Sequence, residues 1–250
     1  VSSHRGGSYK FIETKNFKEE YKILLSAKWG ENSVPIYADD FVKLVGWIIT
    51  EGTYRKDKKW NRTGISISQS YRANPDKIEM IKSVIQSVVG KVYENKTKSN
   101  FGSRMEVSGE IATKIKGLFP DKKLTFDFVN QLTIKQIRFL YDTLILGDGN
   151  RRENHNDRFT TSEKQNFEVF CYICTLLGKT TSFEYQEKNK INSNHKNIYQ
   201  VSVRDTKHTM PFCPIWLGHR KEGAVTKYNF EGLVWCPNTE NETFVARRNG

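Results

Sequence analysis

The sequence predicts an α+β fold made of two similar halves in one chain. Two apolar segments with helical periodicity each end in an acidic residue followed by glycine, Glu51-Gly52 and Asp148-Gly149. Each is followed by strand-like residues, a second helix that ends before Gly-Lys, and further strand-like segments. A repeat of about a hundred residues is too long for a solenoid unit. It therefore indicates two pseudosymmetric halves.

The first half is predicted to run helix, two strands, helix, two strands, helix. In chain order, periodicity and turn residues assign these elements to residues 39–50, 54–62 with 65–70, 75–89, 91–95 with 101–107, and 110–118. Asn74 as the N-cap, Pro75 at the first helical position and Gly90 just past the end delimit the second helix.

The second half repeats this order. The same patterns predict helices at residues 134–146 and 167–177, and strands at residues 158–162, 182–186 and 198–203. The last two strands are separated by residues 188–197, a polar stretch rich in Lys and Asn that indicates a solvated loop.

Basic residues outnumber acidic ones, with 40 Lys and Arg against 28 Asp and Glu and a formal net charge of +12. This excess predicts a polyanionic partner, although composition alone does not separate DNA from RNA or a membrane surface. No apolar run is long enough to span a membrane, and the first residues lack the apolar core of a signal peptide. We therefore expect a soluble, cytoplasmic protein.

The spacing Cys171-x-x-Cys174 has two interpretations. It matches a pair of zinc ligands. However, Phe167, Phe170 and Cys174 share one apolar helical stripe with Leu177, which favours cysteines packed in the core.

An acidic residue at the C-terminal end of a helix is disfavoured by the helix dipole, so a cation should compensate it. If the two apolar helices pack side by side, Glu51 and Asp148 would meet, and a shared divalent metal would relieve their repulsion. Gly46 and Thr143 hold equivalent positions before the acids and are small enough for close helix contact. For one helix alone, an ordinary acid-glycine turn is the simpler interpretation; two matching occurrences favour the shared site.

Residues 44–52, Leu-Val-Gly-Trp-Ile-Ile-Thr-Glu-Gly, and residues 141–149, Tyr-Asp-Thr-Leu-Ile-Leu-Gly-Asp-Gly, resemble the motif copies of a single-chain LAGLIDADG (dodecapeptide) homing endonuclease. The first copy has Glu51 where Asp is commoner, and the second has Tyr141 and Thr143 where Leu and Gly are usual. The resemblance implies two αββαββα subdomains, residues 39–125 and 126–208, with saddle-shaped antiparallel sheets over DNA.

The resemblance also implies a function: metal-dependent hydrolysis of both strands of a long double-stranded DNA target by a monomer. Glu51, Gly52, Asp148 and Gly149 would hold Mg²⁺ or Mn²⁺. The catalytic set would further include a polar strand-end residue and lysines, namely Gln69, Lys122 or Lys123, and Lys207 or Arg204 in the second half. Gln69 alternatively is a surface amide, and the lysine and arginine of the second half alternatively form a solvated charge run.

Polar and basic residues on the predicted strands suit base reading and phosphate contacts in the major groove. The expected DNA-binding residues are Arg55, Lys56, Arg62, Ser66, Ser68, Arg151, Arg152 and Arg158. Such an enzyme would act on DNA in a bacterial or phage host cell.

Both ends resemble parts of an intein splicing (Hint) domain, which predicts small β-rich segments at residues 1–38 and 209–250. Residues 1–5 resemble the block with the splicing histidine, here His4, and residues 233–250 resemble a C-terminal strand pair. His4 alternatively is an ordinary surface residue. Because no nucleophile and strand precede His4 and no terminal asparagine follows, we expect no splicing by this chain alone.

Three alternatives remain open. The first is an RNA maturase of the same fold that binds nucleic acid without cutting it. The second is an intein fragment whose nuclease has decayed, and the third is a plain basic ligand-binding protein. Cleavage of duplex DNA in Mg²⁺ separates the endonuclease from all three.

Overall fold

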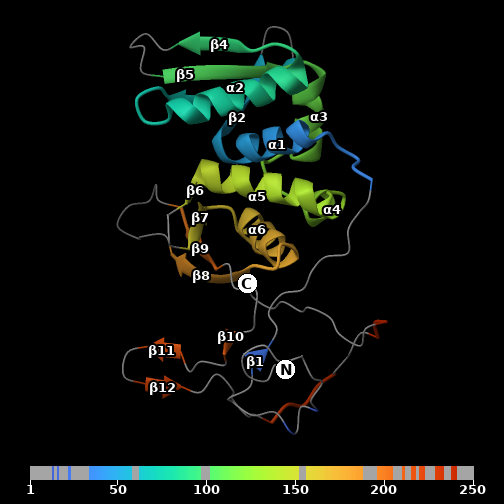
Figure 1. The fold of residues 1–250 in the computed structure, drawn as a ribbon, viewed down its shortest axis with the longest axis vertical. Coiled ribbons are helices and arrows are strands. Elements are labelled where there is room, and N and C mark those ends of the chain that lie inside the picture. The colour runs from blue at the N-terminus through green and yellow to red at the C-terminus, as the bar shows by residue number, and fades with distance from the viewer. Residues whose placement is uncertain are drawn as a thin grey trace.

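The computed structural model combines helices with antiparallel sheets (Figure 1). It describes residues 13, 16, 22–23, 34–57, 62–96, 102–151, 156–187, 196–204, 210–211, 215–217, 220–222, 229–233 and 238–240. Within these residues no helix has the length and apolar character needed to cross a membrane.

The first unit has the predicted element order. Its elements are α1 (Asp39–Glu51), β2 (Gly52–Asp57), β3 (Arg62–Ser70), α2 (Pro75–Val89), β4 (Tyr93–Lys96), β5 (Gly102–Ser108) and α3 (Glu110–Leu118). The four strands form one antiparallel sheet in the order β2-β3-β5-β4.

The second unit has the same strand order, β6-β7-β9-β8, again all antiparallel. Its elements are α4 (Phe126–Asn130), α5 (Ile134–Asp148), β6 (Gly149–Asn150), β7 (Asp157–Thr161), α6 (Lys164–Leu176), β8 (Thr180–Gln186) and β9 (Ile198–Arg204). The final helix that the resemblance implies for this unit falls on residues outside the described part of the chain.

Short-range signals explain most of the element ends. Gly90 has the left-handed φ of 79° and its N–H donates to the Gln86 carbonyl, which confirms the predicted C-cap of α2. Asn74 is the N-cap residue of α2 and Pro75 follows it at the start of the helix, as predicted, but the Asn74 side chain makes no capping hydrogen bond. Its amide nitrogen donates to Gln69 Oε1 at 3.0 Å.

One short helix, α4, was not predicted from the sequence. Its N-cap Thr125 accepts a hydrogen bond from the Phe128 N–H at 3.2 Å. Because α4 is only about one turn long, it lacks the repeated apolar spacing on which prediction depends. Phe128 and Val129 of this helix are buried in the shared core.

Helices α1 and α5 lie side by side between the two sheets (Figure 1). A Cβ at Gly46 would lie 2.7 Å from Cβ of Thr143, and one at Gly147 would lie 2.5 Å from Cβ of Thr50. Residues at equal distances from the two acids therefore meet, and a glycine faces a threonine each time. The predicted close approach at Gly46 and Thr143 is confirmed.

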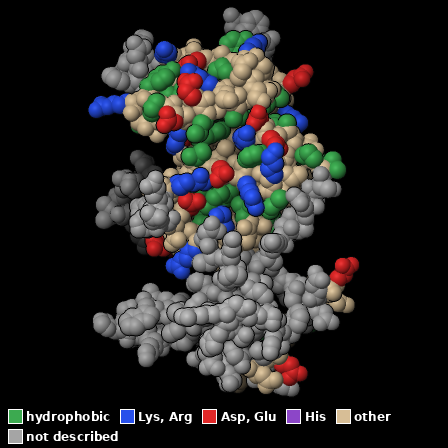
Figure 2. Space-filling view, viewed as in Figure 1, with side chains coloured by type: hydrophobic (Ala, Val, Ile, Leu, Met, Phe, Trp, Pro, Cys, Tyr) green, Lys and Arg blue, Asp and Glu red, His purple; other side chains and the backbone are tan. Residues whose placement is uncertain are grey.

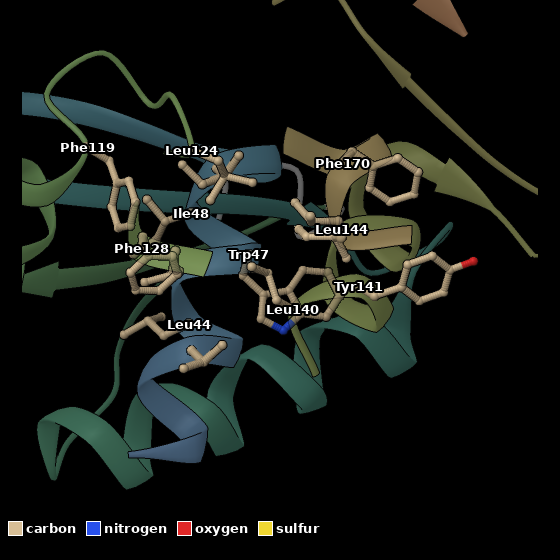
Figure 3. Close-up of a cluster of buried hydrophobic side chains, with 14 of the residues drawn as sticks. Leu44, Trp47, Ile48, Phe119, Leu124, Phe128, Leu140, Tyr141, Leu144 and Phe170 are labelled. Carbon is tan, nitrogen blue, oxygen red and sulfur yellow. The ribbon is translucent and has the colours of Figure 1, made fainter. Parts of the chain in front are cut away.

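One hydrophobic cluster runs through both units. Figure 3 shows Leu44, Trp47 and Ile48 of α1 beside residues of α5, including Leu140 and Leu144. Trp47 is 1% exposed, which leaves almost none of its large apolar surface in water. Burial of this area joins the two helices and fixes the positions of their C-terminal ends.

Cys171 and Cys174 are buried on α6, inside this cluster. This confirms that they are core residues. Burial raises the pKa of the Cys174 thiol well above its ordinary value, which disfavours the thiolate that a zinc ion would need.

Chain segments that flank the two units come together below them. β1 (Lys22–Ile23) pairs antiparallel with β10 (Met210–Pro211), and β11 (Ile215–Leu217) pairs with β12 (Arg220–Glu222). Figure 1 shows these strands beyond the second sheet, at the end of the molecule away from the first unit. His4 lies outside the described residues.

Candidate active site

Each predicted acid is the last residue of its helix and each following glycine is the first residue of a strand. The chain passes from helix to strand with no intervening loop. A Cβ at Gly52 would lie 2.5 Å from the Ile48 carbonyl oxygen, and one at Gly149 would lie 2.5 Å from the Arg158 carbonyl oxygen. These glycines are therefore required by close backbone approach, whether or not their carbonyls bind metal.

The pairing of α1 with α5 brings Glu51 and Asp148 into electrostatic contact. Burial of the Asp148 carboxyl and, after it, the charge of Glu51 raise the pKa of Asp148 to about 6. Lys122 and Lys77 act in the opposite direction. Part of the Asp148 side chain remains open to solvent, so a ligand can reach it. The two lysines therefore offset only part of the combined effect of burial and the Glu51 charge on Asp148.

Lys122 lies close to both acids. It has a left-handed φ of 57°, which is uncommon for a residue with a side chain. Burial lowers the pKa of its ammonium group, and the carboxylates of Asp148 and Glu51 oppose this effect. Of the two adjacent lysines that the sequence proposes, this one therefore faces the acids.

Lys123 points elsewhere. Its Nζ atom lies 3.9 Å from Oε2 of Glu163, at the start of α6. It lines an open hollow together with side chains of α4 and α6, including Phe126 and Glu168. The sequence does not distinguish Lys122 from Lys123, because the difference arises from one backbone conformation.

Lys77 is a site residue that the sequence analysis missed. It lies in the first turn of α2, and its Nζ atom is 4.0 Å from Oε1 of Glu51. Both side chains are half-buried. The only available signal was its position shortly after the strand that ends near Gln69, and this does not distinguish it from other basic residues.

Gln69 lies at the end of β3 and is 7% exposed. Its side chain lies on the same face of the sheet as Ile65 and Ile67, the face that packs on the helices. Gly52 pairs with Ile67, so Gln69 lies two residues beyond the junction of α1 and β2. The alternative interpretation of an exposed surface amide does not hold.

The predicted DNA-binding residues lie in different environments. Arg55, Ser68 and Arg158 are exposed on strands, whereas Ser66 is only 3% exposed and offers little surface to a ligand. Arg55 pairs with Glu106 at 3.4 Å.

Arg151 is engaged by acids of its own unit. Its guanidinium lies 2.6 Å from Asp142 and 3.8 Å from Asp157. Arg204 is exposed at the end of β9. The remaining predictions concern the side chains of Lys56, Arg62, Arg152 and Lys207, which lie outside the described part of the structure.

Arg104 is a second residue that the sequence analysis missed. It is exposed on β5 and pairs with Ser68 of β3 and Asn95 of β4, so these polar residues form a row across the sheet. Figure 2 shows one face of the two units, where basic side chains are interspersed with acidic ones. The net positive charge is therefore not gathered into a uniform patch on this face.

The donor set at the acids fits a hard divalent cation. The described residues contain no group of three or more His, Cys, Asp or Glu arranged around one point, so the protein offers two carboxylates. Mg²⁺ is usually held in this way, by one or two carboxylates that share the ion with water and substrate phosphates. The raised pKa of Asp148 also indicates a place where added positive charge is favourable.

No protein-family model matches the sequence, and no curated protein matches it. Solved structures of homing endonucleases resemble the fold. A structure from mesophilic variants of the homing endonuclease I-DmoI aligns with a TM-score of 0.48 and 13% identity, over 67% of this chain and 89% of that chain.

I-DmoI in complex with DNA and Ca aligns with a TM-score of 0.49 and 13% identity, over 67% of this chain and 83% of that chain. The homing endonuclease I-WcaI bound to its DNA recognition sequence aligns with a TM-score of 0.42 and 16% identity, over 68% and 77%. Because these scores are low, the function proposed below rests on the side chains of this chain.

Proposed function

We propose that this chain is a LAGLIDADG-type homing endonuclease that makes a divalent-metal-dependent double-strand cut in DNA. The observation that carries this proposal is the meeting of Glu51 and Asp148 at the adjoining ends of α1 and α5. Because burial and the Glu51 charge both disfavour an ionised Asp148, this pair of acids is costly in a resting protein, and a functional reason accounts for it. Lys122 and Lys77 beside them supply the positive groups that a phosphate would contact.

Glu51 and Asp148 would hold Mg²⁺ or Mn²⁺, with backbone oxygens of Gly52 and Gly149 as further candidates. When bound, the metal lowers the pKa of coordinated water and neutralises phosphate charge. The Lys122 ammonium would stabilise the negative charge that develops on the phosphate oxygens during attack. Lys77 would hold the Glu51 carboxylate in orientation, and the Gln69 amide would orient the attacking water.

The two sheets would present their solvent faces to DNA. On the first sheet the row of Ser68, Arg104 and Asn95 offers donors and acceptors for base edges. On the second, Arg158 of β7 pairs with Ser202 of β9 in the same way. Because both units belong to one chain, we propose a monomer with pseudosymmetric subdomains at residues 39–125 and 126–208.

The terminal segments support a second, compatible proposal: they are remnants of a splicing domain. The observation in its favour is the pairing of β1 with β10, which joins a segment before the first unit to one after the second. Incubation of the purified chain, followed by intact-mass analysis, tests for residual processing. We expect one unchanged mass.

The endonuclease proposal is tested by incubating a randomised duplex library with the protein in Mg²⁺ and sequencing the ends that are released. We expect site-specific double-strand cuts. Glu51→Gln and Asp148→Asn should each abolish cutting or leave nicks on one strand, whereas Glu110→Gln at the start of α3 should cut like the unmodified chain. Retained DNA binding with an uncut library would contradict the proposal and favour a maturase or a decayed nuclease.

A further inference from the structure

Lys122 owes its position to a residue of the other unit. Asn166 of α6 is 5% exposed, and both ends of its side-chain amide are used by the segment that carries Lys122. Its Nδ2 donates to the Lys122 carbonyl at 3.1 Å, and its Oδ1 accepts from the Leu124 N–H at 2.8 Å. The amide thus bridges the two residues on either side of Lys123.

Neighbouring contacts hold the same segment. The Gln165 side chain donates to the Leu124 carbonyl at 2.7 Å, and the Lys122 N–H donates to the Phe119 carbonyl at 3.0 Å. Together with Asn166, these bonds maintain the left-handed φ of 57° at Lys122, a conformation that a lysine adopts only when its surroundings impose it. In that conformation Lys122 faces the acids and Lys123 faces Glu163.

We propose that Asn166 is a positioning residue for the cleavage site, because its amide holds the backbone of Lys122 so that this lysine, and not Lys123, faces Glu51 and Asp148. This inference rests on the proposed endonuclease function. It assigns part of the site to α6, so the first unit and its linker cannot build the complete site without the second unit. The buried Asn166 amide is the contact that joins them.

An asparagine is needed because the two backbone partners are different. The Lys122 carbonyl requires a donor and the Leu124 N–H requires an acceptor. Alanine supplies neither group. Aspartate matches the shape of asparagine but supplies only the acceptor, so it tests the donor to Lys122 with little change in volume.

The first measurement is single-turnover cleavage by Asn166→Ala, Asn166→Asp, Lys122→Met and the double variant Asn166→Ala/Lys122→Met. Loss of a residue that orients a site group typically lowers activity roughly tenfold to a hundredfold. We expect a decrease of this size in the cleavage rate constant of both Asn166 variants. Their DNA affinity should be unchanged. If Asn166 acts through Lys122, Asn166→Ala should cause no further loss when Lys122 is already Met. A full additional loss in the double variant would overturn the proposal.

The second measurement does not need activity. Amine acylation followed by fragment mass spectrometry gives the ratio of Lys122 to Lys123 modification. In the unmodified chain we expect the two lysines to react at different rates, since Lys122 faces the acids and Lys123 pairs with Glu163, and Asn166→Ala should bring the two rates together. An unchanged ratio would overturn the proposal. If the unmodified chain cuts no DNA, the endonuclease function fails, and this ratio still decides whether Asn166 positions Lys122.

The matched control is Gln136→Ala. Gln136 is likewise a buried amide that joins the two units, since it donates to the Tyr37 carbonyl and to Asp39. It lies near the start of α5, at the opposite end from Asp148. We expect Gln136→Ala to lower the melting temperature without altering the Lys122 to Lys123 ratio or the cleavage rate at temperatures where the variant is folded. Equal effects of Gln136→Ala and Asn166→Ala on that ratio would reduce the role of Asn166 to stability alone and overturn the proposal.

Discussion

Gly46 of α1 lies directly against Thr143 of α5, so close that a Cβ on the glycine would be 2.7 Å from the Cβ of the threonine. The Thr143 hydroxyl is occupied by its own helix, where it donates to the Phe139 and Leu140 carbonyls at 3.0 Å each. The Thr143 hydroxyl oxygen is also the atom that such a Cβ would approach most closely, so this contact sets how near the two acid-bearing helix ends can be.

Gly46→Ala should separate the two helices. The added methyl overlaps Thr143 in a packed core, and overpacking of this kind typically costs about 1–3 kcal/mol. Urea unfolding measures the loss. Adding Thr143→Gly should recover much of it by opening the facing position.

The matched control is Gly117→Ala in α3, where a Cβ would meet nothing within 4 Å. Because alanine favours helix more than glycine does, this variant should gain up to about 1 kcal/mol. If Gly46→Ala were as stable as Gly117→Ala, the close helix contact would be wrong.

Lys122→Met should slow DNA cleavage about a hundredfold, as expected for loss of a group that stabilises developing charge. Lys123→Met removes the adjacent charge and should change the cleavage rate less than about threefold, because Lys123 pairs with Glu163 and not with the acids. Single-turnover assays at saturating protein compare the two. Reversed effects would show that the left-handed conformation at Lys122 is not the active one.

Lys77→Met should lower the cleavage rate roughly tenfold, because Glu51 loses its partner and gains orientational freedom. The matched control is Lys82→Met, which removes another lysine of α2 that pairs with Glu79 and Glu94 rather than with a site acid. Lys82→Met should lower stability but leave the cleavage rate of the folded protein unchanged. Equal rates for Lys77→Met and the unmodified chain would exclude Lys77 from the site.

The lowered pKa of Glu94 predicts how the free energy of unfolding depends on pH. Burial alone would raise the pKa of this carboxyl, but hydrogen bonds from Lys82, Ser103 and Tyr71 outweigh it and lower the pKa from 4.5 to about 2. A carboxyl with a lowered pKa stabilises the fold above its unfolded pKa and loses this contribution as pH falls toward the folded value. Glu94 should therefore contribute on the order of 1–3 kcal/mol at pH 7.

This contribution is measured by urea unfolding of the unmodified chain and of Glu94→Gln at several pH values. The difference between them should be constant above about pH 5 and shrink between about pH 4.5 and pH 2. A difference independent of pH over that range would show that Glu94 acts through packing and not through its charge.

Several features could be predicted because each depends on neighbouring residues. The element order follows from apolar periodicity and turn residues, and the two acid-glycine junctions appear in the sequence as matching ends of apolar helices. Gly46 and Thr143 could be identified as small residues at equivalent positions. Helix α4 was missed since one turn shows no periodicity.

The sequence by itself determined that two apolar helices end in Glu51 and Asp148, because helix formation and termination depend on residues within a few turns. Only the tertiary structure decided that Lys77 and Lys122 lie beside these acids while Lys123 turns away. Likewise, only the fold brought Asn166 to the backbone of Lys122. These relations join residues far apart in the chain, and they depend on packing distances and on one left-handed φ angle that local propensity disfavours.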